Sequence, residues 1–148
     1  VPGVSSFCAA AAAAEAEYTL PGVSQTLIIS RMEGRTPVPE REGIRSLAAH
    51  RASMVLFLST GMLRKLCSEL VAGGYPEDTP AALVYRASWP DERVLRGTLA
   101  SLPADAEAEG IVKTALVLVG DFLGDTYELS KLYDPAFEHG YRRGKAEP

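Results

Sequence analysis

Cysteine and histidine are scarce in this chain of 148 residues, which contains two of each. Cys8 and Cys67 lie far apart in two apolar helical patterns, so we expect core thiols in a reducing compartment, the cytoplasm, and no disulfide framework. His50 and His139 have no metal-ligand spacing with each other or with the cysteines. The sequence therefore predicts no metal site, with His50 closing a helix and His139 solvated.

Positive charge and long apolar runs are also lacking. Lys and Arg number 15 against 19 Asp and Glu, which gives a net charge of −4 and no overall cationic field for nucleic acid or an acidic membrane. No apolar run approaches the roughly 20 residues that span a bilayer. The Ala-rich stretch 7–14 has no basic region before it, as a signal peptide would. We expect neither nucleic acid nor a membrane as a partner.

The common catalytic and nucleotide-binding motifs are absent as well. The sequence contains no Gly-x-Gly-x-x-Gly, no P-loop, no Gly-x-Ser-x-Gly and no His-Glu-x-x-His. A serine or cysteine nucleophile with a neighbouring base is therefore not predicted, and the sequence names no catalytic residue.

The chain is organised around residues 54–61, Met-Val-Leu-Phe-Leu-Ser-Thr-Gly. A run that is apolar on both faces is typical of a strand covered by helices on both sides, so we expect the central strand of an α/β sheet here. Ligands in open α/β sheets bind beyond the carboxyl ends of the strands, which makes residues 58–61 the first candidate for a ligand site. The alternative is a buried strand followed by an ordinary turn.

The rest of the chain alternates apolar strand patterns with amphipathic helical patterns. We expect one α/β domain with a mixed sheet of about five strands flanked by helices, preceded by a helix that belongs elsewhere. The predicted strands are 23–31, 54–59, 80–85, 93–98 and 114–119, and the predicted helices are 7–17, 43–51, 62–72 and 99–109. The Pro90 turn predicts that strand 93–98 is antiparallel to its neighbour.

The polar residues with a possible ligand role are few. Ser5 and Ser6 precede the first helix, where they either cap it or leave its N-terminus facing a ligand. Arg35 and Arg86 follow strands, so they either bind carboxylates at the ligand edge or form salt bridges with nearby acidic residues. Trp89 is expected either in the core or in an apolar pocket beside Arg86.

Four segments carry a resemblance to a known family. They are Val-Pro-Gly-Val-Ser-Ser at 1–6, Glu-Gly-Arg-Thr-Pro-Val-Pro-Glu at 33–40, Tyr-Arg-Ala-Ser-Trp-Pro-Asp-Glu at 85–92 and Leu-Tyr-Asp-Pro-Ala-Phe-Glu-His-Gly-Tyr-Arg at 132–142. Together they resemble the S-adenosylmethionine-dependent tetrapyrrole methylases, and the first segment and the strand pattern resemble the whole class. The loop 33–40 and the tail 132–142 resemble, more specifically, the branch that methylates a corrin precursor at C-11 in cobalamin biosynthesis.

The resemblance implies two α/β domains that hold S-adenosylmethionine, the methyl donor, in the cleft between them. The Gly-rich loop of the first domain has no counterpart here. We therefore expect residues 1–20 to end the first domain, 21–120 to form the second domain and 121–148 to form a tail. The missing first domain would be a partner of this chain, the family resemblance implies a homodimer, and the isolated fragment is expected to be inactive.

The resemblance also implies site residues. Ser5 and Ser6 match a loop pair that contacts the cofactor, and Leu58 matches a position that packs on it. Ala87 matches a small residue near the adenosine, and Thr114 and Ala115 match contacts to adenine. Leu58 and Thr114 share one edge of the sheet only if their two strands are antiparallel. A tetrapyrrole (precorrin) substrate carries many carboxylates, for which the resemblance favours Arg35 and Arg86.

The residues are compatible with more than one function. The chain is either part of a methyltransferase that acts on precorrin-4, with or without cobalt, or part of another precorrin methylase. A third hypothesis names a different class of protein, a non-catalytic α/β domain that serves dimerisation or small-molecule binding.

Overall fold

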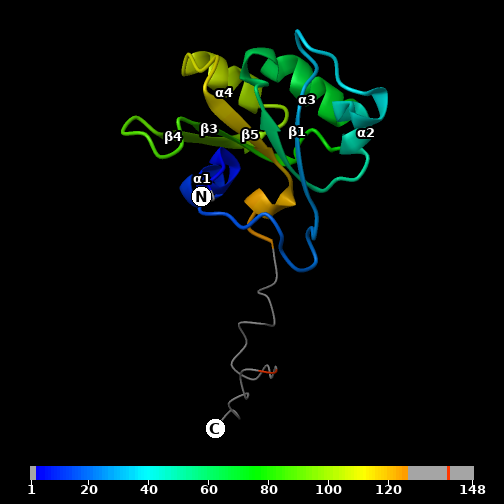
Figure 1. Ribbon diagram of the computed structural model, residues 1–148, viewed down its shortest axis with the longest axis horizontal. Coiled ribbons are helices and arrows are strands. Elements are labelled where there is room, and N and C mark those ends of the chain that lie inside the picture. Colours follow the sequence, from blue (N-terminus) through cyan, green and yellow to red (C-terminus); the bar gives the residue numbers. More distant parts are fainter. Residues whose placement is uncertain (1–2, 127–139, 141–148) are drawn as a thin grey trace.

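The computed structural model describes residues 3–126 and Gly140. Within these residues the chain forms one mixed five-stranded sheet with helices on both faces (Figure 1). The predicted α/β class and strand number are thereby confirmed. The prediction for His139, and the tail segment 132–142 apart from Gly140, lie outside the described residues.

The strands follow the order β1-β2-β5-β3-β4 across the sheet. β1 is parallel to β2, whereas β5 is antiparallel to both β2 and β3, and β4 is antiparallel to β3 as predicted. The strands are β1 (Leu27–Arg31), β2 (Ser53–Phe57), β3 (Pro80–Tyr85), β4 (Arg93–Thr98) and β5 (Ala115–Val119).

The prediction of β2 as the central strand is wrong, because β5 occupies the centre. Every residue of β5 is buried, and this strand joins the pair β1–β2 to the pair β3–β4. β2 is still an interior strand that pairs on both sides, which explains its continuous apolar run.

Three helices cover one face of the sheet and α1 covers the other (Figure 1). Short 3-10 turns η1 (Glu40–Glu42), η2 (Thr60–Met62) and η3 (Asp121–Leu123) link the elements. The helices are α1 (Ser6–Ala13), α2 (Ile44–Ala48), α3 (Leu63–Ala72) and α4 (Leu102–Ala108).

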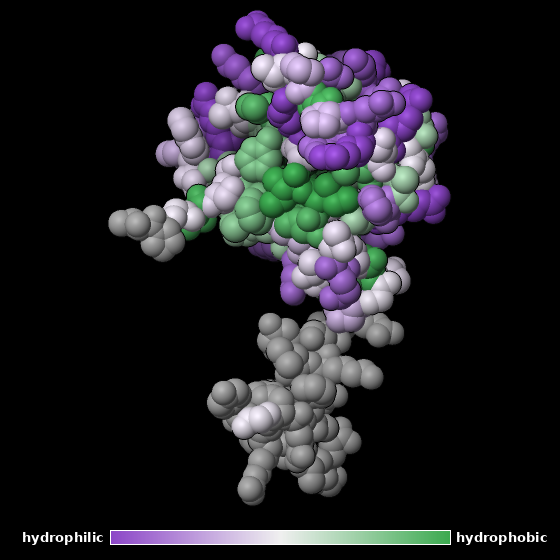
Figure 2. All heavy atoms as spheres, turned by 45° about the vertical axis from the view of Figure 1, so that its right-hand side comes forward, coloured by the Kyte–Doolittle hydropathy of each residue, from purple (hydrophilic) through white to green (hydrophobic). Residues whose placement is uncertain are grey.

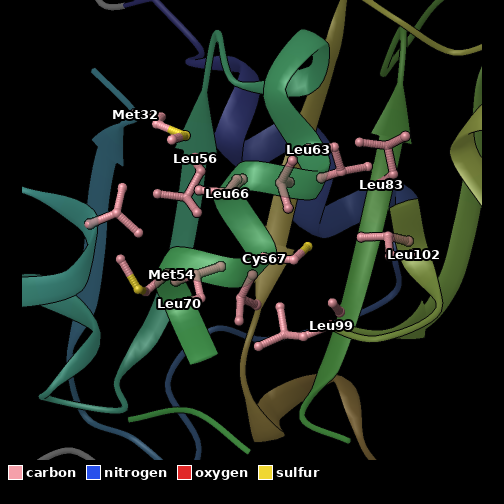
Figure 3. Packing of buried hydrophobic residues seen from close by; sticks show 14 of the residues in the cluster. Met32, Met54, Leu56, Leu63, Leu66, Cys67, Leu70, Leu83, Leu99 and Leu102 are labelled. Carbon is pink, nitrogen blue, oxygen red and sulfur yellow. The ribbon is translucent and has the colours of Figure 1, made fainter. Parts of the chain in front are cut away.

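The main core lies between the sheet and the three-helix face (Figure 3). α3 contributes Leu63, Leu66, Cys67 and Leu70, which follow the i, i+3, i+4, i+7 spacing of one helical face. These side chains pack with residues of β2 and β3, so Cys67 is a buried core thiol as predicted. α2 lies so close to the end of α3 that a Cβ at Gly73 would come within 2.5 Å of the Ala48 Cβ, which leaves room only for glycine.

A second apolar cluster lies between α1 and the opposite face of the sheet. Ala10 and Ala14, one helical turn apart, pack with Val84 and other strand residues. Cys8 therefore points away from the sheet and is exposed, so its prediction as a core thiol is wrong. The helix ends earlier than predicted, because Glu15 adopts a left-handed backbone with φ 48°.

Helix α1 thus covers this sheet, and the assignment of residues 1–20 to another domain stays a prediction. Among the described residues, no helix combines the length and the apolar character that crossing a membrane requires. On the side where β1 is the edge strand, Ile29 is 47% exposed. Turning this side forward reveals an apolar area below a hydrophilic layer (Figure 2).

Candidate functional site

The strand directions bring four chain segments to one edge of the sheet. β1 and β2 end side by side, with Arg31 opposite Phe57. β3 also ends here, because Tyr85 lies opposite Ala115, the first residue of the antiparallel strand β5. The antiparallel pairing of β2 and β5 that the predicted cofactor residues require is therefore present. We call the residues just beyond these strand ends (Leu58, Arg86, Ala87 and Thr114) the ligand edge.

The ligand edge carries an unusual concentration of left-handed backbone. Leu58, Arg86 and Thr114 have φ of 53°, 47° and 59°, and Ser88 has φ of 69°. Four of the six non-glycine residues with positive φ in the described chain therefore lie at or beside this edge. Each such conformation costs on the order of 1–3 kcal/mol, and such strain clusters at functional sites, where the surrounding structure enforces it.

Hydrogen bonds hold these strained residues in place. The backbone N–H of Arg86 donates to the carbonyl of Thr114 at 3.0 Å, which ties the end of β3 to the start of β5. The hydroxyl of Thr60 donates to the carbonyl of Ala115 at 3.0 Å. The carbonyl of Thr114 is thus held by the segment after β3, and the carbonyl of Ala115 is held by the segment after β2.

The side chains of the edge suit a flat apolar ligand. Leu58 is 82% exposed, although it directly follows a buried strand. Ala87 is half-buried and small, so a ligand can approach its backbone closely, and Thr114 is exposed while Ala115 is buried. The edge as described combines apolar surface with accessible backbone, which is the usual composition of a small-molecule site.

Arg86 places a cation at the same edge. Its guanidinium lies 5.0 Å from the ring centroid of Tyr85 and 5.3 Å from that of Trp89, and it forms a 2.5 Å ion pair with Asp91. The salt-bridge alternative for Arg86 is therefore correct as far as Asp91 is concerned. The Arg86 Nε is buried without a hydrogen-bond partner in the described chain, so the group retains a donor. Trp89 is 57% exposed and stacks on this cation outside the core.

Arg35 lies on the exposed loop that follows β1. Because β1 ends at the ligand edge, this loop begins there. Arg31 organises this loop, because its guanidinium donates to the carbonyls of Met32 (3.3 Å), Thr36 (3.2 Å) and Pro37 (3.0 Å). Sequence reasoning missed this role. The available signal was an arginine at the end of a strand before a loop with two prolines.

Ser5 and Ser6 lie at the start of α1 and are exposed. Ser5 occupies the N-cap position, but its side chain makes no capping hydrogen bond, so the capping role predicted for its hydroxyl is not observed. The residue after Ser6, Phe7, packs against the same apolar cluster as Phe57 and Ala87.

The perturbed titratable groups lie elsewhere. Burial raises the pKa of the Cys67 thiol to about 11, which keeps it protonated and unreactive near neutral pH. Burial, with a smaller contribution from Asp121, raises the pKa of Tyr75 to about 12, and burial also raises the pKa of Tyr18. No group of three or more metal-binding side chains occurs among the described residues.

A separate groove of about 680 Å³ lies next to η2, the turn that follows Leu58 and Ser59. Residues of η2, α3 and α4 line it, among them Met62, Arg64 and Glu107. None of the predicted cofactor residues contributes to this groove.

Taken together, fold and site define an α/β domain whose ligand edge joins apolar surface, strained backbone and an arginine. Residues 1–103 match the model of the family described as Tetrapyrrole (Corrin/Porphyrin) Methylases. The chain belongs to this family.

Individual relatives give a finer comparison. The chain is 54% identical over 144 residues to the cobalt-precorrin-4 C(11)-methyltransferase of Methanocaldococcus jannaschii, covering 97% of this chain and 56% of the relative. It is similar to the X-ray structure of a cobalamin biosynthetic enzyme, cobalt precorrin-4 methyltransferase CbiF, with 48% identity and a TM-score of 0.82 over 84% of this chain and 52% of that one.

A more distant structure contains a bound ligand. The uroporphyrin-III C-methyltransferase of Thermus thermophilus complexed with S-adenosylhomocysteine is 26% identical, with a TM-score of 0.63 over 83% of this chain and 52% of that one. The chain therefore spans about half the length of these relatives.

Proposed function

We propose that this chain is part of an S-adenosylmethionine-dependent methyltransferase that methylates precorrin-4, or its cobalt form, at C-11 in cobalamin biosynthesis. The observation that carries the proposal is the 54% identity over 97% of the chain to a relative named for this reaction. The ligand edge supports it, because strained backbone and exposed apolar surface meet there.

The residues at the ligand edge fit the cofactor. Leu58 offers an exposed apolar surface, and Ala87 allows close approach of a flat base to the backbone. Thr114 and Ala115 present a rigid backbone segment beside them. The side chain of Ser5 does not cap α1, so the first backbone N–H groups of this helix, beside Ser5 and Ser6, are left available for a ligand. When bound, the cofactor supplies a methyl group on a sulfonium, and the protein's task is to position the reactants and exclude water.

The carboxylates of the substrate would be bound by arginines. Arg86 is held by Asp91 and two aromatic rings while its side chain stays 34% exposed, and Arg35 is exposed on the loop that Arg31 fixes. Both guanidinium groups can donate paired hydrogen bonds to a carboxylate. A preorganised arginine loses less conformational entropy on binding than a free one.

The remaining parts of the proposal concern assembly. We place residues 1–20 at the end of a first methylase domain, 21–120 in a second domain and 121–148 in a tail. The cofactor cleft would be completed by the first domain, and the whole enzyme would be a cytoplasmic homodimer. The family resemblance supports this arrangement, as does the coverage of about half of each relative.

Calorimetric titration with S-adenosylhomocysteine tests the proposal. The chain alone and the chain joined to a first methylase domain at its amino end are titrated in parallel. Binding by the joined protein, with no binding by the chain alone, is the expected result. Failure of both to bind would contradict the methyltransferase function and favour a domain that serves dimerisation or binds another small molecule.

A further inference from the structure

Two adjacent hydroxyl groups, on Ser59 and Thr60, lie buried directly behind the ligand edge. The side chain of Ser59 is fully buried and Thr60 is 7% exposed. Buried hydroxyls are costly unless they are hydrogen-bonded, so their partners reveal what they stabilise. Both residues lie in the segment 58–61 that the sequence pattern predicts to be near a ligand, but neither is among the cofactor or substrate residues that the family resemblance implies.

The side chain of Ser59 bridges the residues on either side of Leu58. Its hydroxyl donates to the carbonyl of Phe57 at 2.7 Å, on the other side of Leu58, and accepts from the backbone N–H of Met32 at 3.0 Å. The first bond favours the left-handed backbone that turns the Leu58 side chain out to 82% exposure. The second bond ties this turn to the start of the Arg35 loop.

Thr60 reaches in the opposite direction. Its hydroxyl donates to the carbonyl of Ala115 at 3.0 Å, across from the turn at the end of β2 to the start of β5. The two hydroxyls therefore connect the ends of β1 and β2 with the start of β5. They fix the distance between Leu58 on one segment and Thr114 and Ala115 on another.

We propose that Ser59 and Thr60 are positioning residues that preorganise the ligand edge for the cofactor. This inference rests on the proposed function of that edge. The pairing of β2 with β5 keeps the two strands together, but without the two hydroxyls Leu58 and Thr114, which lie beyond the paired residues, would be held less firmly, and the cofactor would have to order them on binding. The structure predicts a loss of affinity that exceeds what a simple loss of stability explains.

Ser53 provides a matched control at the opposite end of the same strand. Its hydroxyl is also buried and donates to a backbone carbonyl, that of Tyr18, at 2.5 Å. Because β2 separates Ser53 from the ligand edge, Ser53→Ala removes a bond of the same kind without touching the edge. It measures the cost of a lost buried hydrogen bond alone.

The test uses this chain joined to a first methylase domain and compares Ser59→Ala, Thr60→Val, Thr60→Ser and Ser53→Ala. Affinity for S-adenosylhomocysteine is measured by calorimetry, well below each melting temperature. We expect the affinity to fall about tenfold in Ser59→Ala and Thr60→Val. Ser53→Ala and Thr60→Ser, which keeps the hydroxyl, should bind within about twofold of the parent protein.

Amide hydrogen exchange in the ligand-free protein gives a readout that does not depend on binding. Exchange at Leu58 and at Thr114–Ala115 should be faster in Thr60→Val and Ser59→Ala but unchanged in Ser53→Ala. Equal affinities for all variants that bind would overturn the inference and leave the proposed function standing. A parent protein that binds no S-adenosylhomocysteine would overturn both.

Discussion

Arg86 and Thr114 are joined by a 3.0 Å hydrogen bond from the Arg86 N–H to the Thr114 carbonyl, and both residues have left-handed backbones. The bond links β3 and β5 at the point where the chain leaves the sheet at the end of β3 and enters it again at the start of β5. It also brings a proposed substrate residue into direct contact with a proposed cofactor residue.

Leu58→Ala should separate binding from stability. The side chain is 82% exposed, so its loss should change the free energy of unfolding by less than about 0.5 kcal/mol. If the cofactor covers it, the affinity of the joined protein for S-adenosylhomocysteine should fall about tenfold, as expected for losing an apolar contact worth about 1.5 kcal/mol. Calorimetry with a parallel thermal melt measures both quantities. Unchanged affinity would remove Leu58 from the site.

Arg35→Ala and Arg86→Ala should each raise the dissociation constant of the tetrapyrrole substrate while leaving cofactor binding nearly intact. A lost charge-assisted hydrogen bond costs about 1.5–3 kcal/mol, or roughly 10- to 100-fold in affinity. Equal loss of cofactor binding would indicate a structural role instead.

Asp91→Asn is the matched control for Arg86. It weakens the 2.5 Å ion pair but leaves the guanidinium between Tyr85 and Trp89. Because the two side chains are 34% and 53% exposed, solvent screens the pair, and its loss should cost at most about 1 kcal/mol of stability. A substrate affinity as low as that of Arg86→Ala would mean that the ion pair, rather than the arginine itself, matters.

Arg31→Ala should release the loop that carries Arg35, because three carbonyl groups lose their donor. We expect the Michaelis constant for the substrate to rise about tenfold, with kcat less affected, since the loop must then be ordered on binding. Arg31→Lys keeps the charge but cannot make the forked contact, so it should restore little. Full rescue by lysine would argue for a purely electrostatic role.

Because of Tyr75, the free energy of unfolding should depend on pH in the alkaline range. Its hydroxyl donates to the Ala52 carbonyl, and burial raises its pKa from 10.0 to about 12. The folded state therefore favours the neutral phenol, and this contribution is complete below pH 10 and is lost as the pH rises towards 12. The stability advantage of the parent protein over Tyr75→Phe should shrink across that window, by up to about 2–3 kcal/mol. A constant difference, measured by denaturant unfolding from pH 9 to 12, would contradict the assignment.

Much of the fold could be read from the sequence because the strands carry strong apolar patterns. The bounds of β3 and β4 agree with the predicted residues, and β5 begins one residue later than predicted. The position of a strand within the sheet depends instead on pairing between distant segments, so the central place of β5 was not predictable from its own residues. In α1, alanines surround the helix and leave no distinct apolar face, which explains the wrong prediction for Cys8.

The candidate site was less accessible to sequence reasoning. Leu58, Ala87, Thr114 and Ala115 were suggested by family resemblance, and the topology places the backbone of all four at one edge, while their contacts with the cofactor remain predictions. Ser59, Thr60 and Arg31 act through hydrogen bonds to backbone carbonyls. Such bonds leave no spacing signature, because any residue of the partner segment can supply the carbonyl.

The central place of β5 has a consequence for the order of folding. β1 and β2 form a parallel pair linked by α2, and β3 and β4 form a local hairpin, but the two units join the same sheet only through β5. Such non-local pairing is slow, since it closes a long loop before the contacts form. Leu58 belongs to the first unit and Arg86 to the second. The two therefore come to share one edge only when residues 115–119 insert between the units.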